Sequence, residues 1–161
     1  MSAAQQKLDI GVDGVEMGED TTKDKFLTFV IDTEEYGIEI ANIKEIIKLT
    51  RITRVPESPP YVEGIINLRG DIVPVIDVRK RFGKSTKEYD TLTCIVVIDY
   101  VKYRIGLIVD SVNEVMYIHE ENILPPPSSK LNYYNQFIRN IGRADDGVKL
   151  LLDLEKLLAD D

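Results

Sequence analysis

The stretch YVEGIINLRGDIVPVIDVRKRFG, residues 61–83, contains two apolar runs on either side of a short polar segment. Each run is rich in Val and Ile, which favour strands, and Arg69 and Gly70 stand between the runs where a tight turn is expected. The pattern predicts a β-hairpin with an arginine at its tip. A short basic helix should follow and end at Gly83, because glycine commonly terminates helices.

A second hairpin is predicted upstream, in KFLTFVIDTEEYGIEI, residues 25–40, with a polar turn over residues 32–35. The next segment, ANIKEIIKL, residues 41–49, fits a helix or a strand, because its isoleucines have helical spacing but are β-branched. We expect a short turn that leads into a strand. Three prolines within residues 56–60 then interrupt the sheet, since proline cannot donate a hydrogen bond to a neighbouring strand.

The order strand, turn, strand and helix occurs twice along the chain. FVIDTEEYGIEI aligns with VVIDYVKYRIGL, which places Asp32 opposite Asp99, and YVEGIINLRGDIVPVIDVRKRF aligns with FIRNIGRADDGVKLLLDLEKLL, which places Arg69 opposite Asp145. Two copies of one unit indicate two similar subdomains. Small sheets of about five strands avoid exposed edges by curling into barrels. We therefore expect a mostly β fold with two five-stranded β-barrel subdomains and short helices.

Two segments lack the repeated pattern. Residues 1–24 carry scattered glycines and charges without a period, which predicts a flexible N-terminal tail before a folded domain of residues 25–161. The segment ENILPPPSSKLNYYNQ, residues 121–136, contains consecutive prolines at residues 125–127 and is predicted to form a surface loop. Both a simple spacer and a loop that contacts a partner fit this composition.

Composition excludes several classes of function. The chain of 161 residues has 43% hydrophobic and 30% charged residues, as soluble globular proteins do. Its formal net charge of -8 repels polyphosphate, so nucleic acid is not expected as a partner. No apolar run approaches the roughly 18 residues that cross a bilayer, and the start lacks the pattern of a secretion signal. We expect a cytoplasmic protein that does not insert into the membrane.

Side chains that carry catalysis or bind metals are sparse. His119 is the single histidine and Cys94 the single cysteine, so two-histidine and cysteine-cluster metal sites cannot form within the chain. We expect His119 to be a solvated loop residue and Cys94 to be buried as a small apolar group. Phosphate-binding glycine motifs are absent, and paired acids such as Glu34 and Glu35 fall in predicted turns. The sequence therefore predicts no cofactor, no metal and no enzymatic activity.

Arg69 is not imposed by the repeat, because Asp145 takes its place in the second copy. The simplest interpretation is a solvated turn residue, since surface ion pairs contribute only about 0–1 kcal/mol. The alternative is protein recognition, because the planar donors of a guanidinium suit interfaces and arginine is enriched at interface hot spots. Glu45, one strand earlier, is the expected ion-pair partner of Arg69.

Over residues 26–159, the chain resembles the CheW family of bacterial chemotaxis coupling proteins. The resemblance rests on three motifs in order: EEYGIEIANIKEII, ITRVPESPPYVEGIINLRGDIVPVIDVRKRFG and IGLIVDSVNEV. It implies two intertwined five-stranded barrels around a common core and an adaptor without catalytic activity. It also implies two partners, the regulatory domain of the histidine kinase CheA and the cytoplasmic tips of methyl-accepting chemoreceptors, which the adaptor holds together in signalling arrays.

The resemblance also assigns candidate binding residues. The positions that the family uses for contact with receptor or kinase are matched by Ile43, Glu45, Arg69, Ile105 and Gly106. Among them, Ile105 and Gly106 match a wall of the groove that receives the receptor's helical hairpin. The turn glycines of the family's hairpin are matched by Gly64 and Gly70.

Two other functions stay open. A detached regulatory domain of a CheA kinase would share the barrels, but its kinase would carry phosphotransfer and ATP-binding segments, which we do not expect beside a sequence that starts at Met1. A small β-barrel enzyme would need a sheltered acid–base pair, which the sequence does not offer.

Overall fold

A computed structural model describes residues 22–126 and 136–159. The first repeat contains β1 (Lys25–Ile31), β2 (Glu34–Glu39), η1 (Ile40–Asn42), β3 (Ile43–Lys48), β4 (Val62–Leu68), β5 (Asp71–Asp77) and α2 (Val78–Arg81). The second repeat contains β6 (Cys94–Tyr100), β7 (Tyr103–Val109), β8 (Ser111–Tyr117), η2 (Glu120–Asn122), β9 (Ile123–Leu124), β10 (Ile138–Ala144), β11 (Gly147–Leu152) and α3 (Leu154–Leu158).

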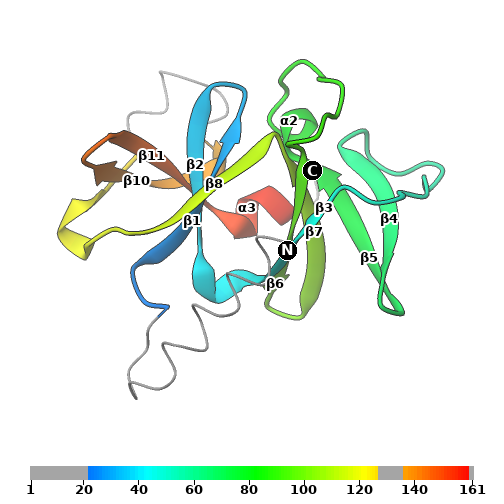
Figure 1. Ribbon diagram of the computed structural model, residues 1–161, viewed down its shortest axis with the longest axis horizontal. Helices are drawn as coiled ribbons and strands as arrows, with labels where there is room; N and C mark the ends of the chain where they lie inside the picture. Colours follow the sequence, from blue (N-terminus) through cyan, green and yellow to red (C-terminus); the bar gives the residue numbers. More distant parts are fainter. Residues whose placement is uncertain (1–21, 127–135, 160–161) are drawn as a thin grey trace.

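The strands form two sheets, and each sheet contains strands from both repeats (Figure 1). The five-stranded sheet has the order β3-β6-β7-β5-β4, so the β6–β7 hairpin of the second repeat lies between strands of the first. The six-stranded sheet has the order β8-β1-β2-β11-β10-β9, so the β1–β2 hairpin lies between strands of the second repeat. The predicted mostly β fold with two subdomains and short helices is confirmed. Within the described residues, the hydrogen-bonded ladders do not close either sheet into a complete barrel.

The β1–β2 and β6–β7 hairpins lie at the centres of the two sheets. Their structural equivalence differs from the sequence alignment. Ile31 pairs with Glu34 across the β1–β2 turn, and Tyr100 pairs with Tyr103 across the β6–β7 turn. Asp32 is therefore equivalent to Val101, and its alignment with Asp99 was wrong by two residues. A shift by two preserves the alternation of apolar and polar positions, so the sequence pattern could not detect it.

The repeat unit of β4 and β5 corresponds to that of β10 and β11 as aligned. Leu68 pairs with Asp71 on one tip and Ala144 with Gly147 on the other, which places Arg69 opposite Asp145 as predicted. Short helices follow both hairpins. The side chain of Asp77 caps α2 and that of Asp153 caps α3, each by accepting a hydrogen bond from a backbone N–H three residues later. Gly83 ends the first helix with φ +75°, as expected.

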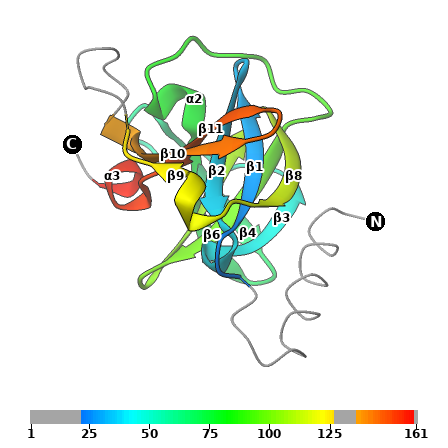
Figure 2. The same ribbon diagram turned by 90° about the vertical axis from the view of Figure 1, so that its left-hand side faces the viewer.

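A shared core joins the two sheets. Its largest side chains are aromatic and come from separate elements of both repeats: Tyr36 of β2 lies 5.2 Å from Phe82 after α2, and Phe82 lies 5.4 Å from Phe137 before β10, measured between ring centroids. All three rings are buried, with further residues of both sheets around them. Figure 2 shows the strands of the two sheets crossing behind one another around this core. Neither repeat therefore encloses the core alone.

The segments outside the repeat differ partly from expectation. Residues 40–42 form a turn that leads into β3, as predicted. The predicted loop of residues 121–136 begins with η2 and β9, which pairs with β10, and residues 127–135 lie outside the described part. Of the predicted tail, only residues 22–24 are described, and they form a turn before β1. Among the described residues, no helix has the length and apolar character to cross a membrane.

The environment of His119 agrees with the prediction from the sequence, whereas Cys94 is less buried than predicted. His119 is exposed and its ring packs edge-on against Tyr117, with 4.5 Å between the centroids. Cys94 is half-buried, less than expected, because it lies at the first position of β6. Burial raises the pKa of its thiol, which disfavours the nucleophilic thiolate.

Arg79 of α2 connects elements of both sheets through a buried ion-pair network. Its Nε donates to Asp110 Oδ1 at 2.9 Å, and its Nη2 donates to Asp110 Oδ2 at 2.9 Å. Nη2 also lies 3.3 Å from Asp32 Oδ1, and Nη1 donates to the carbonyl oxygen of Ser85 at 2.9 Å. The Asp32 N–H donates to Asp110 Oδ2 at 2.7 Å. Because Asp110 follows β7 and Asp32 lies in the β1–β2 turn, Arg79 holds the two sheets to one helix.

The Asp110 carboxyl should make the stability of the fold depend on pH. Burial raises its pKa, but hydrogen bonds from Arg79 and from the Asp32 N–H, with the charge of Arg79, outweigh burial and hold the pKa below its ordinary value. A carboxyl with a lowered pKa stabilises the fold above its unfolded-state pKa of about 3.9, and this contribution is lost as pH falls through the folded-state pKa. We expect Asp110→Asn to lower the free energy of unfolding more at pH 7 than at pH 3, measured by urea denaturation. An equal loss at both pH values would contradict this.

Candidate partner-binding surface

Arg69 and Gly70 form the tip of the β4–β5 hairpin. Both have positive φ, +52° and +95°, as a type I′ turn requires at its two central positions. Asn67 Oδ1 accepts a hydrogen bond from the Gly70 N–H at 2.8 Å and stabilises this turn. The turn directs the Arg69 side chain out of the hairpin, where it is 67% exposed.

Arg69 pairs with Glu45, as the sequence predicted. Arg69 Nη2 donates to Glu45 Oε2, and the Glu45 side chain is only 11% exposed. Glu45 belongs to β3, at one edge of the five-stranded sheet, whereas Arg69 follows β4, at the other edge. The ion pair therefore links the two edges of this sheet. Because most of the guanidinium stays exposed, its remaining donors are accessible to a partner.

A second charged cluster lies beside this pair. Arg104 of β7 donates to Asp99 of β6, with 2.7 Å between Nε and Oδ1, and lies 3.1 Å from Asp71 at the start of β5. The hydrogen bond with Asp99 raises the pKa of Arg104, and the same bond lowers the pKa of Asp99. Both groups therefore remain charged across the physiological pH range.

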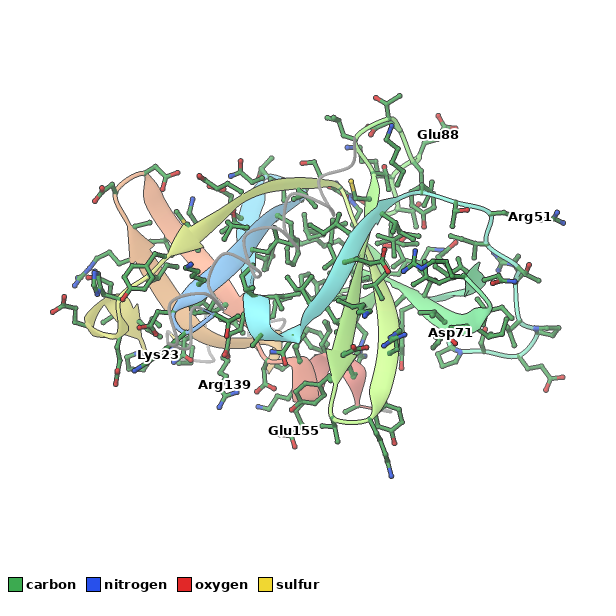
Figure 3. All side chains as sticks on the ribbon, turned by 60° about the horizontal axis from the view of Figure 1, so that its bottom comes forward. Lys23, Arg51, Asp71, Glu88, Arg139 and Glu155 are labelled. Atoms are coloured by element: carbon green, nitrogen blue, oxygen red, sulfur yellow. The ribbon has the colours of Figure 1, made fainter. Side chains whose placement is uncertain are left out.

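Exposed apolar side chains adjoin the charged cluster. Ile72, Val101 and Tyr103 are 61%, 82% and 58% exposed, and they line a shallow hollow of about 430 Å³ together with the charged cluster. We call the set the tip surface: Arg69, Asp71, Ile72, Asp99, Val101, Tyr103 and Arg104. Figure 3 shows Asp71 at the outer end of the five-stranded sheet. Exposed apolar groups ringed by charges are typical of protein-binding surfaces.

The sequence did not identify the apolar part of the tip surface. Val101 occupies a turn position with φ +57°, which a β-branched residue rarely adopts, and its equivalent in the first repeat is Asp32. Tyr103 is likewise equivalent to Glu34. An apolar residue where the other copy has an acid was the available signal for Tyr103, but the two-residue error in alignment placed Tyr103 opposite Tyr36 and concealed it.

The other candidate residues lie further along the five-stranded sheet. Gly106 is buried and pairs with Val97, whose other neighbour is Glu45. A Cβ built on Gly106 would lie 2.7 Å from the side chain of Ile95. Gly106 thus allows close packing inside the sheet. Ile43 and Ile105 both pair with Ile98, are half-buried and pack against the shared core. Contact of Ile43, Ile105 and Gly106 with a partner stays a prediction.

Gly70 is a turn glycine as predicted, but Gly64 is not. Gly64 lies inside β4 at an irregularity in the pairing with β5, with φ +151°. A Cβ built there would lie 2.1 Å from the Thr53 carbonyl oxygen. The glycine therefore allows the segment after β3 to pack directly on β4, where Thr53 and Ile65 exchange backbone hydrogen bonds of 2.9 Å.

Gly64→Ala should lower the free energy of unfolding by about 2 kcal/mol or more, because it combines backbone strain with a collision against backbone. Gly70→Ala is the matched control, since its φ is also positive but no atom lies within 4 Å of the added Cβ. The control should lose less, about 1 kcal/mol from strain alone. Urea denaturation of both variants measures the difference, and equal losses would show that the approach of Thr53 is unimportant.

Comparison with known proteins matches this architecture. The family profile described as CheW-like domain matches residues 25–161. The chain is 34% identical over 140 residues to the chemotaxis protein CheW of Klebsiella aerogenes, an alignment that covers 87% of this chain and 84% of that protein. It is 36% identical over 137 residues to the chemotaxis protein CheW of Helicobacter pylori, covering 85% of this chain and 82% of that protein.

A solved structure shares the fold as well. The crystal structure of the scaffolding protein TtCheW from Thermoanaerobacter tengcongensis superimposes with a TM-score of 0.80 at 37% sequence identity, covering 86% of this chain and 94% of that one. The family profile spans all of the described strands, from β1 to β11. The chain therefore belongs to the CheW family of chemotaxis proteins.

Proposed function

We propose that this protein couples methyl-accepting chemoreceptors to the histidine kinase CheA and supports receptor control of the kinase in signalling arrays. In this proposal the protein is a cytoplasmic adaptor that acts through its surface and has no catalytic turnover. It binds the regulatory domain of the kinase and the cytoplasmic tips of the receptors. Membership of the CheW family and the similarity to TtCheW, which is described as a scaffolding protein, support the proposal.

The observation that carries the proposal is the exposed guanidinium of Arg69 on a rigid hairpin tip. The ion pair with Glu45 fixes its position, and exposed Ile72 and Tyr103 lie on the same tip surface. A rigid arginine next to apolar area is the combination that protein interfaces favour, because apolar burial supplies affinity while the charges set the register.

A detached regulatory domain of a kinase is the alternative from the same fold. The Klebsiella and Helicobacter relatives are CheW proteins, and the alignments cover 84% and 82% of their own lengths. Similarity to CheW proteins over most of their own length favours a coupling protein. A small β-barrel enzyme has less support, because the similar solved structure is described as a scaffolding protein.

The test is reconstitution of kinase control from three purified components. Kinase, a receptor cytoplasmic fragment and this protein are mixed, and autophosphorylation of the kinase is followed with each component omitted in turn. We expect a change in kinase activity that requires all three components. The proposal fails if kinase activity is the same with and without this protein while both partners are present, or if neither partner sediments with it.

A further inference from the structure

The row of neighbouring residues that contains Gly64 in the five-stranded sheet has an equivalent in the six-stranded sheet, and the two rows are packed differently. In the five-stranded sheet, Gly64, Val75 and Gly106 are neighbours across β4, β5 and β7. Ile52 and Thr53 pack directly on this row at Gly64. The segment after β3 thereby covers the row at Gly64.

The equivalent row in the six-stranded sheet consists of Asn140, Leu151 and Gly37, across β10, β11 and β2. Asn140 is the equivalent of Gly64 in the second repeat. Its side chain occupies the position that the Thr53 backbone takes next to Gly64 in the first repeat. Its Nδ2 donates to the carbonyl oxygen of Leu124 at 3.3 Å, while Ile123 of β9 lies beside it. The direct packing seen at Gly64 is therefore missing here.

A hollow of about 550 Å³ lies over this row. Its floor is apolar and consists of Phe26, Gly37, Ile123, Leu151 and Leu152. Its rim carries both signs of charge, from Lys23, Asp24, Glu39, Glu120 and Arg139. Figure 3 shows Lys23 and Arg139 on the same side of the molecule, at the six-stranded sheet. The rim charges largely cancel, and the exposed lining is more polar than apolar, so the hollow suits a segment that carries aliphatic side chains between polar groups.

The chain itself leads to this hollow. Thr22, Lys23 and Asp24 line it, and they form a turn in which the Lys25 N–H donates to the Thr22 carbonyl oxygen at 3.2 Å. Asp24 has φ +61°, so the chain reverses direction at the rim. The preceding residues 1–21 therefore join the described structure at the rim of the hollow.

The sequence before Thr22 suits an apolar floor. LDIGVDGVEM, residues 8–17, places apolar residues between acids and glycines. Val15 and Met17 lie seven and five residues before Thr22, so an extended chain carries Met17 at most about 18 Å from the rim. A ligand tethered by so few residues has an effective concentration of about millimolar, so even weak apolar contacts suffice for binding.

We propose that the N-terminal segment of this chain docks in the hollow of the six-stranded sheet, with Val15 and Met17 on the apolar floor. The docked segment covers the row of Asn140, Leu151 and Gly37, as Ile52 and Thr53 cover the equivalent row in the other sheet. This inference is independent of the proposed coupling function, because the tip surface belongs to the five-stranded sheet.

The test compares three full-length proteins by NMR: the natural chain, Val15→Asp/Met17→Asp, and the control Ala3→Asp/Gln5→Asp, which adds the same charge. We follow the methyl resonances of Ile123 and Leu151, on the floor, and of Ile66 and Val97, in the other sheet. Docking predicts that the Val15→Asp/Met17→Asp protein shifts the floor resonances and leaves those of Ile66 and Val97 unchanged. The control should give the spectrum of the natural chain.

Each other result overturns the inference. Floor resonances that are identical in all three proteins would show that the segment does not occupy the hollow. Equal shifts in both variants would assign the effect to charge and not to Val15 and Met17. Shifts of the natural chain that vary with protein concentration would place the segment of one copy on another copy.

Discussion

Arg79→Met is expected to lower the free energy of unfolding by about 3 kcal/mol or more, since breaking a buried ion pair leaves a buried charge without its partner. Without Arg79, the Asp110 carboxylate would keep the hydrogen bond from the Asp32 N–H. The side chains of Arg79 and Asp110 are each only 11% exposed. Methionine keeps much of the length and apolar stem of arginine, so lost packing contributes little. Urea denaturation at pH 7 measures the change.

Arg104→Met is the matched control for this substitution. Arg104 also pairs with two aspartates, Asp99 and Asp71, but its side chain is 35% exposed and solvent screens the charges. A far smaller loss of stability is expected. If both substitutions cost the same, the network around Arg79 has no special role in joining the sheets.

Arg69→Glu is expected to weaken binding of the kinase or of the receptor fragment by at least tenfold, about 1.4 kcal/mol, while the fold stays intact. The substitution removes the exposed guanidinium and places a carboxylate next to Glu45, so the net charge of the tip surface becomes more negative by two. This expectation rests on the proposed function. Titration calorimetry with the kinase regulatory domain and with the receptor fragment measures the two affinities.

Two variants keep the result interpretable. Arg51→Glu makes the same change of charge at an exposed residue between β3 and β4, outside the tip surface, and should bind as the natural protein does. Arg69→Lys keeps the charge but loses the planar fork, so intermediate affinity is expected. Unchanged affinity of Arg69→Glu for both partners, with an unchanged circular dichroism spectrum, would remove Arg69 from the binding surface.

Local structure was readable from the sequence because each element depends on nearby residues. The β4–β5 hairpin followed from two Val- and Ile-rich runs around Arg69 and Gly70, and the end of α2 followed from Gly83. The partner of Arg69 was also found, because Glu45 is an acid on the strand that precedes the hairpin.

Long-range pairing was not readable in the same way. The parallel contacts of β5 with β7 and of β11 with β2 decide how the repeats interleave, yet apart from Asp77 the residues involved are apolar side chains and glycines that occur throughout the sheets. Arg79 looked like one of several basic residues in a short helix, and nothing nearby in sequence identified Asp110 as its partner.

The paired acids show the same limit. Glu35 was predicted to be a turn residue, but Glu35 and Asp146 both bind Lys149, whose side chain is fully buried, at 2.5 Å and 3.2 Å. Burial lowers the pKa of this ammonium group, but the hydrogen bonds and charges of the two acids outweigh it and raise the pKa above the ordinary value. The role is structural as expected, although the partner is distant in sequence.

The interleaving of the repeats sets a condition on how this protein could change through evolution. The β1–β2 hairpin needs β8 and β11 from the second half on its two sides, and the β6–β7 hairpin needs β3 and β5 from the first. A gene shortened to either half would encode a central hairpin with both flanks bare, which is prone to aggregate. Once the ancestral unit had been duplicated and interleaved in this way, neither copy could be lost again, although each was free to acquire a different surface.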